Sequence, residues 1–274
     1  MPRRRHTTAV FVVATTLLAL AFTSARVRGQ QDPASADAAC GELTIRVWDG
    51  YAPYIFRDAA GNWRGIEVEM ARALAKEAGY RPRLVAIPWN RAMRQLERGE
   101  LDIVLTLSKT PERERFTHFF APSTHEQIVV VTRPELVSRF ERVRTLDDLV
   151  AVGRIGINQE VDYGDDFRKK WNRNPAFRAR FEAVTEPRLN IVKLRRGRLA
   201  GLLRDKLSVA YSIRHGGEYA GLRYVELPCF PRRPVYFGIS KRIAPGKVEA
   251  LRRAYTALRE RGVFDEILQR WTRE

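Results

Sequence analysis

Residues 101–116 read LDIVLTLSKTPERERF, and this stretch decides the fold. Its first seven residues are mainly apolar, which predicts a buried strand of a parallel sheet. Polar residues follow, and Pro111 favours the first turn of a helix because its ring fixes φ and it lacks an N–H group. The order strand, polar turn and helix is typical of the carboxyl edge of an open α/β sheet, where such sheets bind ligands.

Within this turn, Arg113 has the clearest chemical use. A guanidinium grips a carboxylate through two parallel hydrogen bonds, and nearby hydroxyl groups complete the set of donors. Thr106, Ser108 and Thr110 supply those hydroxyls. The stretch therefore predicts a site for a small anion. A surface arginine beside a helix cap is the alternative that these residues alone leave open.

The remainder of the chain alternates strands and helices. The residue patterns predict strands at 43–48, 83–87, 101–107, 127–132, 154–158, 207–211 and 235–240, and helices at 66–78, 91–98, 165–171, 187–196, 245–261 and 264–271. Asn90 and Thr145 are expected to cap helices. Helices between successive strands make those strands parallel, so we predict an α/β fold. The pattern begins again after a Pro-containing crossing at 119–122, which indicates two lobes with a cleft between them.

Composition limits the range of partners. The 274 residues are 45% hydrophobic, enough for one large or two modest cores, and the formal charge is +17. Such a basic balance is compatible with a nucleic-acid partner. However, the basic residues are scattered over every segment, without zinc-ligand spacing or an aromatic RNA-binding signature. A biased base composition of the genome explains the charge better, and we expect no nucleic-acid partner.

The amino terminus has the pattern of a secretory signal peptide. Arg3–Arg5 make a basic start, residues 7–22 are uncharged and rich in Ala, Val and Leu, and Thr23-Ser24-Ala25 offers small residues to a signal peptidase. We therefore expect residues 1–25 to be removed on export to the periplasm and residues 26–40 to form a spacer.

Export also permits a disulfide. Cys40 and Cys229 are the two cysteines of the chain and so the one available pair. A bridge between these distant segments and two separate buried thiols are both compatible with the sequence.

Several short motifs follow one another in a set order along the chain. They are Tyr51-Ala-Pro-Tyr54, Gly65 before a helix, Pro88-Trp89, Gly99-Glu-Leu-Asp102, Ser108-x-Thr110-x-x-Arg113, Thr145-Leu-Asp-Asp148, Gly156, Tyr163-Gly164, Gly197-Arg198, VYFGISK at 235–241, and Arg261-Gly262. In this order and spacing they resemble the bacterial extracellular solute-binding proteins of family 3, the periplasmic receptors associated with polar amino-acid ABC transporters. The resemblance spans nearly the whole mature chain.

The resemblance implies the two-lobed, type II periplasmic binding protein fold, in which two α/β lobes close on a ligand like a hinge. Residues 41–122 would form the first lobe and 123–234 the second, and residues 235–274 would return to the first lobe with the closing helices. We expect a monomer that delivers a small-molecule ligand to an ABC permease in the inner membrane, without a cofactor or a metal ion.

The resemblance also assigns roles at the strand ends of the first lobe. Arg113 would hold the α-carboxylate of the ligand, and Ser108 and Thr106 would add hydrogen bonds. Three aromatic residues would form walls around the ligand side chain: Tyr51, Tyr54 and Trp89. Taken from the sequence alone, these aromatic residues fit the core or the rim of a lobe equally well.

From the second lobe, Asp205 would meet the α-ammonium group of the ligand. Asp49 could assist it, although a turn-capping role suits Asp49 better. Tyr163 stands at a strand end of the second lobe. The sequence departs from the family pattern at two places. Ala200 stands where an Asp is common, and Glu160-Val161-Asp162 replaces the usual glycine and hydroxyl that help to grip the carboxylate.

These observations favour binding over catalysis, so we expect no catalytic residue. One alternative is an enzyme on the same fold, a small-carboxylate dehydratase, since His125 lies near the crossing and Glu160 near the cleft. Another is a receptor module that signals through a partner protein.

Overall fold

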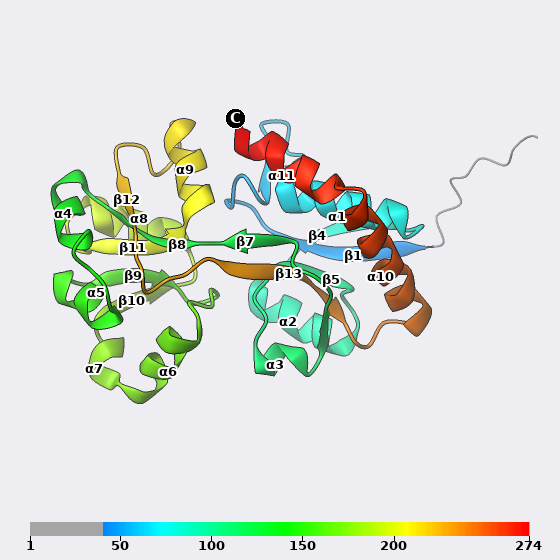
Figure 1. Ribbon diagram of the computed structural model, residues 1–274, viewed down its shortest axis with the longest axis horizontal. Helices are drawn as coiled ribbons and strands as arrows, with labels where there is room; N and C mark the ends of the chain where they lie inside the picture. The colour runs from blue at the N-terminus through cyan, green and yellow to red at the C-terminus, as the bar shows by residue number, and fades with distance from the viewer. Residues whose placement is uncertain (1–40, 274) are drawn as a thin grey trace, which may run out of the picture. The chain divides into compact units, whose positions relative to one another are not determined.

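The computed structural model describes residues 41–273, which form two large β-sheets with helices packed on them and one small two-stranded sheet (Figure 1). One sheet has the strand order β4-β1-β5-β13-β6, with β7 also paired to β13, and the other has the order β10-β9-β11-β8-β12. We call the parts built on these two sheets the first lobe and the second lobe. The architecture is the two-lobed α/β fold that the sequence predicts.

The sheet of the first lobe is parallel at its centre. Its strands are β1 (Glu42–Val47), β4 (Arg81–Ala86), β5 (Ile103–Leu107), β6 (Thr117–Phe119), β7 (Thr124–Glu126) and β13 (Arg233–Ser240), and the hairpin β2 (Phe56–Arg57) with β3 (Trp63–Arg64) stands apart. β1 pairs in parallel with β4 and β5, whereas β13 runs antiparallel to β5, β6 and β7. The three parallel strands therefore direct their carboxyl ends to one edge.

Helices cover both faces of this sheet. They are α1 (Ile66–Glu77), α10 (Pro245–Glu260) and α11 (Val263–Arg273) on one face, α2 (Trp89–Arg98) on the other, and the short α3 (Pro111–Glu114). Ile45 of β1 packs with the α1–α10–α11 side, and Leu96 of α2 packs with Val104 and Leu107 of β5 on the opposite side. The alternation of side chains along each strand supplies these two apolar faces.

The second lobe is built in the same way. Its strands are β8 (Ile128–Thr132), β9 (Ile155–Asn158), β10 (Phe181–Val184), β11 (Gly201–Asp205) and β12 (Arg223–Glu226), and its helices are η1 (Pro134–Leu136), α4 (Val137–Phe140), α5 (Leu146–Val152), α6 (Asp165–Arg173), α7 (Pro175–Arg178), α8 (Pro187–Arg195) and α9 (Lys206–Arg214). β9, β10 and β11 are parallel, and β8 runs antiparallel to β11 and β12. Phe167 centres an aromatic core on one face of the sheet, and Leu194 lies in the core on the other.

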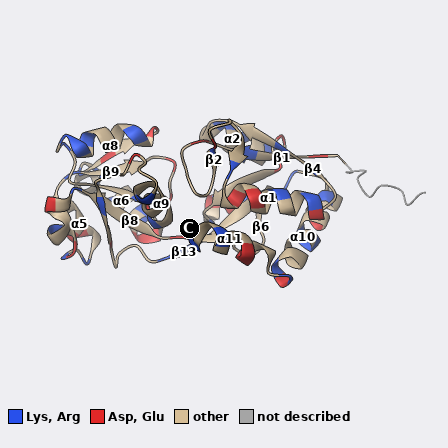
Figure 2. Cartoon of the chain, turned by 90° about the horizontal axis from the view of Figure 1, so that it is seen from above, with Lys and Arg blue, Asp and Glu red and all other residues tan. Residues whose placement is uncertain are grey.

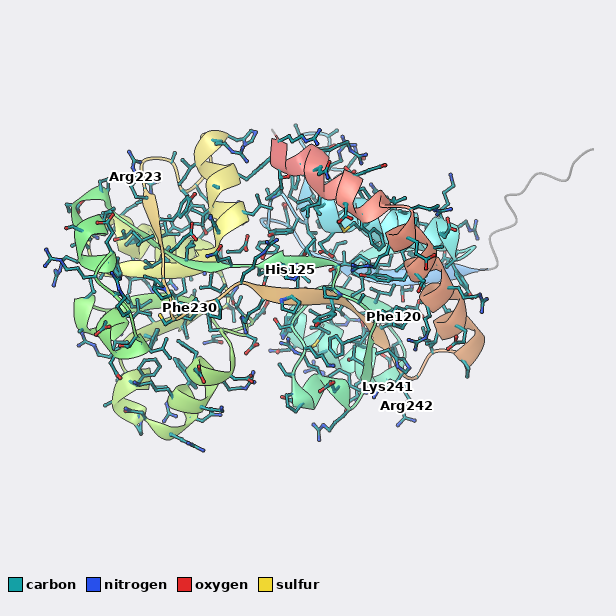
Figure 3. The ribbon with its side chains drawn as sticks, viewed as in Figure 1. Phe120, His125, Arg223, Phe230, Lys241 and Arg242 are labelled. Atoms are coloured by element: carbon teal, nitrogen blue, oxygen red, sulfur yellow. The ribbon has the colours of Figure 1, made fainter. Side chains whose placement is uncertain are left out.

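Two chain segments cross between the lobes. β7 leads from the first lobe into β8, and β13 returns from the second lobe, so that Thr124 pairs with Val235 and Glu126 with Arg233. Figure 3 labels His125 on this pair of strands. The first crossing is the segment 121–126, and the hydroxyl of Tyr255 on α10 lies 2.8 and 2.7 Å from the carbonyl oxygens of its residues Ala121 and Pro122, which share the one hydroxyl proton. The predicted lobe boundaries, between residues 122 and 123 and between residues 234 and 235, lie next to these crossings and stay predictions.

Two local predictions are wrong. Residues 207–211 form part of helix α9, and the strand is β11, which ends at Asp205 because the Asp205 side chain accepts a hydrogen bond from the Ser208 N–H and so caps the helix. Asn90 does not cap α2, which begins one residue earlier at Trp89. Thr145 does form the predicted cap, as one half of a capping box with Asp148.

Basic and acidic residues are scattered over both lobes (Figure 2). Among the described helices, none combines the length and the apolar character that a membrane crossing needs. The predicted signal peptide, the spacer and Cys40 lie outside the described residues. Cys229 is partly buried in the second lobe, and a bridge to Cys40 and two separate thiols both stay compatible with the sequence.

Candidate functional site

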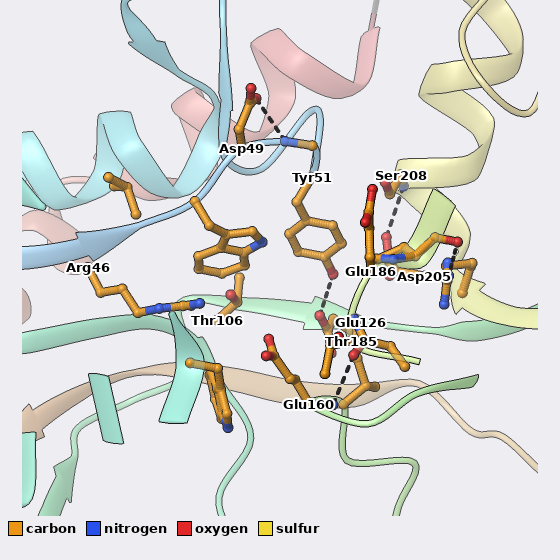
Figure 4. A pocket seen from close by; sticks show the side chains of 18 of the residues that line it. Arg46, Asp49, Tyr51, Thr106, Glu126, Glu160, Thr185, Glu186, Asp205 and Ser208 are labelled. Atoms are coloured by element: carbon orange, nitrogen blue, oxygen red, sulfur yellow. Dashed lines mark hydrogen bonds between the residues drawn. The ribbon is translucent and has the colours of Figure 1, made fainter. Parts of the chain in front are cut away.

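The carboxyl ends of strands from both lobes border one cavity of about 610 Å³ (Figure 4). β1, β4 and β5 end on its first-lobe side, and β9, β10 and β11 end on its second-lobe side. The residues that follow these strands line the cavity, among them Trp48, Asp49, Tyr51, Trp89, Ser108, Glu160, Asp162, Glu186 and Ser208. Open α/β sheets bind ligands in such crevices, and the volume suits a small molecule.

Arg113 lies on the cavity wall, where the sequence places it. The hydroxyl of Thr110 accepts a hydrogen bond from the Arg113 N–H at 3.3 Å and so fixes the start of α3. One Nη1 donor of the guanidinium is used by the Ser108 carbonyl at 2.9 Å, and the guanidinium carbon lies 5.0 Å from the centre of the Trp89 ring. Burial lowers the pKa of Arg113, although the group remains charged at any physiological pH. A guanidinium has five N–H donors, so this arrangement leaves donors for a ligand.

The strand end that precedes Arg113 has an unusual backbone. Thr106 has a φ of 49°, in the left-handed region that β-branched residues seldom adopt. Such conformations cost about 1–3 kcal/mol and concentrate at ligand sites. Both Thr106 and Ser108 line the cavity, so the turn places the two predicted hydroxyl residues on its wall.

Acidic side chains meet at the base of the cavity, close to the crossing strands. The Tyr51 hydroxyl donates a hydrogen bond of 2.5 Å to Glu126, and Asp205 accepts hydrogen bonds from the N–H groups of Ser208 at 2.9 Å and Gln127 at 3.3 Å. Burial raises the pKa of Glu126 to about 7, with a further rise from the charge of Asp205. Burial likewise raises the pKa of Asp205 to about 6. The sequence predicted Tyr51 and Asp205 but not Glu126.

Two predicted aromatic residues do not line this cavity. Tyr54 is 1% exposed in the core of the first lobe, where its ring stacks on Tyr51 with the ring centres 4.9 Å apart. The Tyr163 hydroxyl accepts a hydrogen bond from the Asn158 N–H at 2.9 Å, and its ring packs on Phe167. Tyr54 therefore supports the cavity wall from behind. Tyr163 holds the loop after β9 and borders an adjoining hollow of about 680 Å³.

Other predicted positions are occupied by protein contacts. Asp49 lines the cavity, but its carboxylate accepts hydrogen bonds from the N–H groups of Gly50 at 2.8 Å and Arg57 at 3.0 Å, as a turn-capping residue does. Asp162 pairs with Arg168 at 2.8 Å and Arg233 at 3.1 Å. Glu160, two residues earlier, lines the cavity and burial raises the pKa of its carboxyl group.

Arg46 is a cavity residue that the sequence reasoning missed. It is the last residue but one of β1, is 4% exposed, and donates a hydrogen bond from Nε to the Ile87 carbonyl at 3.1 Å. Its guanidinium carbon lies 4.4 Å from the centre of the Trp48 ring and 5.2 Å from that of Trp89. An arginine inside a strand that should be apolar on both faces was the signal that could have identified it.

Comparisons with known proteins identify relatives of this chain. A probable histidine-binding protein of Neisseria gonorrhoeae is 27% identical over 266 residues, which cover 94% of this chain and 94% of the relative. Cyclohexadienyl dehydratase of Pseudomonas aeruginosa is 27% identical over 127 residues, 46% of this chain and 47% of the enzyme.

A solved structure has the same fold. It is a substrate-binding protein of an ABC uptake transporter from Streptococcus pneumoniae with bound histidine, and its TM-score is 0.70 at 20% identity over 85% of this chain and 93% of that one. The family model described as bacterial extracellular solute-binding proteins, family 3, matches residues 43–274. Because this match covers most of the sequence, the chain belongs to the bacterial extracellular solute-binding proteins, family 3, as its motifs predict.

Proposed function

We propose that this protein is a periplasmic receptor that closes on a small ligand of the amino-acid type and delivers it to an ABC permease. The observation that carries the proposal is the placement of Arg113 and Asp205 on opposite lobes of one cavity. A guanidinium on one side and a carboxylate on the other complement the carboxylate and the ammonium group of an amino acid. Amino-acid-binding relatives support this choice of ligand class.

Binding in such a cavity is coupled to hinge closure. A ligand that contacts both lobes binds the closed form more tightly than the open form, and this difference shifts the equilibrium towards closure. The crossing strands β7 and β13 are the segments about which the lobes would move. A closed form differs in surface from an open one, which gives a permease a means to recognise the loaded receptor.

The first test measures ligand binding through thermal stability. Amino acids and other small carboxylates are screened for an increase in Tm, since a ligand that binds only the folded state stabilises it by mass action. The variant Arg113→Ala should weaken the best ligand about 100-fold or more, because a bidentate ion pair is lost. The matched control is Arg115→Ala, which removes an exposed arginine two residues further along the chain. If both variants bind the ligand equally well, Arg113 is not a binding residue.

A dehydratase is the second candidate, and two observations favour it. One relative is cyclohexadienyl dehydratase, and Glu126 carries a carboxyl group with a pKa of about 7 at the cavity, which suits a general acid at neutral pH. His125, in contrast, is exposed on β7 and is not a lining residue. Incubating each stabilising ligand with the protein and following its concentration separates the two functions. Consumption that Glu126→Gln abolishes would establish an enzyme. A ligand concentration that stays constant would support the receptor function.

A further inference from the structure

Arg46 is a buried cation that has no ion-pair partner among residues 41–273. The side chain is 4% exposed, and its Nε–H bonds to a backbone carbonyl, which carries no net charge. Within residues 41–273, no carboxylate forms an ion pair with it. Removing a charge from water is costly unless a partner compensates, and buried charges in proteins are normally paired. The rings of Trp48 and Trp89 offset part of this cost by cation–π attraction.

The guanidinium group is directed at the cavity. Arg46 is one of its lining residues, and Figure 4 shows the side chain extending from β1 towards the open space beside Thr106. Nε is occupied by the Ile87 carbonyl, so the two Nη groups are the donors that remain. They offer a planar pair of donors, which is the arrangement that recognises a carboxylate.

Arg46 and Arg113 lie close enough to act on one ligand. Their guanidinium carbons are 5.2 and 5.0 Å from the centre of the same Trp89 ring, so these carbons are separated by about 10 Å at most. A carboxylate carbon in a bidentate pair lies about 4 Å from the guanidinium carbon. A small molecule with two acidic groups can therefore reach both arginines at once.

We propose that Arg46 is a second anion-binding group of this cavity and that the ligand carries an acidic group in addition to the carboxylate held by Arg113. The proposal rests on the receptor function and names its ligand class, an acidic amino acid or a related dicarboxylate. Asp205 and Glu126 remain for the ammonium group of an amino acid.

Glu160 is the competing partner. It lines the same cavity from the second lobe, and its charge acts on Arg46 although the two groups do not form an ion pair in this structure. If closure brought them together, Arg46 would serve as a latch between the lobes and would not contact a ligand. The two roles predict different results, because a latch improves the binding of every ligand, whereas an anion site improves only the binding of acidic ones.

The experiment compares acidic ligands with their amides. Dissociation constants are measured for glutamate, aspartate, glutamine and asparagine with the wild-type protein, Arg46→Met, Arg46→Lys and Glu160→Gln. We expect the wild type to bind one acidic ligand about 10-fold to 100-fold more tightly than its amide, which corresponds to one charge-assisted hydrogen-bonded contact. Arg46→Met should abolish this preference and leave amide binding within about 3-fold, and Arg46→Lys should retain part of it. The control is Arg83→Met, an exposed arginine on the neighbouring strand β4.

Three results would overturn the proposal. The first is a wild-type preference for neutral or cationic amino acids. The second is an acidic preference that survives in Arg46→Met, or that is undiminished in Arg46→Lys if the methionine variant does not fold. The third is an equal loss for acid and amide in both Arg46→Met and Glu160→Gln, which would identify the latch. If amino acids bind and Arg113→Ala abolishes that binding while Arg46→Met does not change it, the receptor function stands and this inference fails. If no ligand stabilises the wild type, the receptor function itself fails.

Discussion

Arg46 and Arg113, on the first-lobe side of the cavity, are held differently from Asp162 on the second-lobe side. On the first-lobe side, Arg46 and Arg113 make hydrogen bonds to backbone carbonyls and lie against tryptophan rings. On the second-lobe side, Asp162 is bonded to Arg168 and to Arg233 of the crossing strand. Charges in the first group are held in place without being neutralised, whereas those in the second are neutralised by the protein. A cation that is positioned but unpaired is available to a ligand, so this difference separates candidate binding residues from structural ones.

Glu67 extends the comparison into the interior of the first lobe. It is fully buried on α1, and its carboxyl group accepts hydrogen bonds from the hydroxyls of Thr124 at 2.8 Å and Ser123 at 3.1 Å, both neutral groups of the first crossing. Burial raises its pKa to about 7, and the two hydroxyls oppose part of that rise. The charged form of Glu67 is therefore unfavourable in the folded protein.

The largest predicted effect concerns this carboxyl group and pH. A folded-state pKa near 7 lies above the unfolded value near 4.5, so the folded state holds the proton more tightly. The resulting stability is complete below about pH 4.5 and is lost as pH rises to about 7, by about 3 kcal/mol in all. We expect Glu67→Gln to remove this loss. Urea unfolding at pH 5 and pH 8 measures it, and a variant that loses as much stability over this range as the wild type would contradict the assignment.

The next prediction tests the ion pairs of Asp162. Asp162→Asn removes the negative charge between Arg168 and Arg233 and should lower the free energy of unfolding by about 1–2 kcal/mol, less than for a fully buried pair because both arginines are partly exposed. Asp166→Asn is the matched control, since Asp166 is exposed on the following helix α6. Equal denaturation curves for the two variants would show that Asp162 is not a structural ion-pair partner.

The sequence predicted more of the fold than of the site. Strands such as β1, β5 and β8 carry patterns that depend on a few neighbouring residues, so they were found without tertiary information. β11 was missed because Gly201 and Arg204 interrupt its apolar run, and α9 beside it was mistaken for a strand. In that region the helix cap made by Asp205 sets the boundary between β11 and α9. The periodicity of apolar residues does not reveal such a cap.

Within the site, motif order indicated Arg113 and Ser108, which follow the predicted strand at 101–107, and the family resemblance indicated Asp205. Arg46 and Glu126 were missed because their importance depends on which strands lie side by side. Tyr54 was misplaced for the same reason. Its motif sets it next to Tyr51, but only the packing of the turn on α1 decides which ring faces the cavity and which enters the core. Partners across a cavity cannot be read from local patterns.

A third prediction concerns the pH dependence of binding. An ammonium group is held best by ionised carboxylates, and Glu126 and Asp205 have pKa values of about 7 and 6. The groups around them are the hydroxyls of Tyr51 and Tyr54, which stay neutral because their pKa values are raised well above the usual value, and the ionisable side chains of Glu67 and Arg233. Affinity for an amino acid should therefore rise about 10-fold between pH 5 and pH 8. Titration calorimetry at both values measures the rise, and Glu126→Gln should reduce it. A ligand without an ammonium group is the control and should bind independently of this titration or bind better in acid.

The smallest predicted effect is also the most direct test of whether Arg46 is an unpaired charge. In the absence of ligand, Arg46→Met replaces a buried cation by an apolar side chain of similar length, which should change the free energy of unfolding by less than about 1 kcal/mol or increase it. Arg83→Met, on the solvent side of β4, should be close to neutral. A loss well above 1 kcal/mol for Arg46→Met alone would mean that the protein neutralises this charge after all, with Glu160, whose charge raises the pKa of Arg46, as the partner. If the two residues are paired, Glu160→Gln should lower the free energy of unfolding by the same amount. The double variant should then be no less stable than either single variant. Near-neutral behaviour would instead leave the guanidinium positioned, charged and unpaired, which is the state that a ligand-binding group requires.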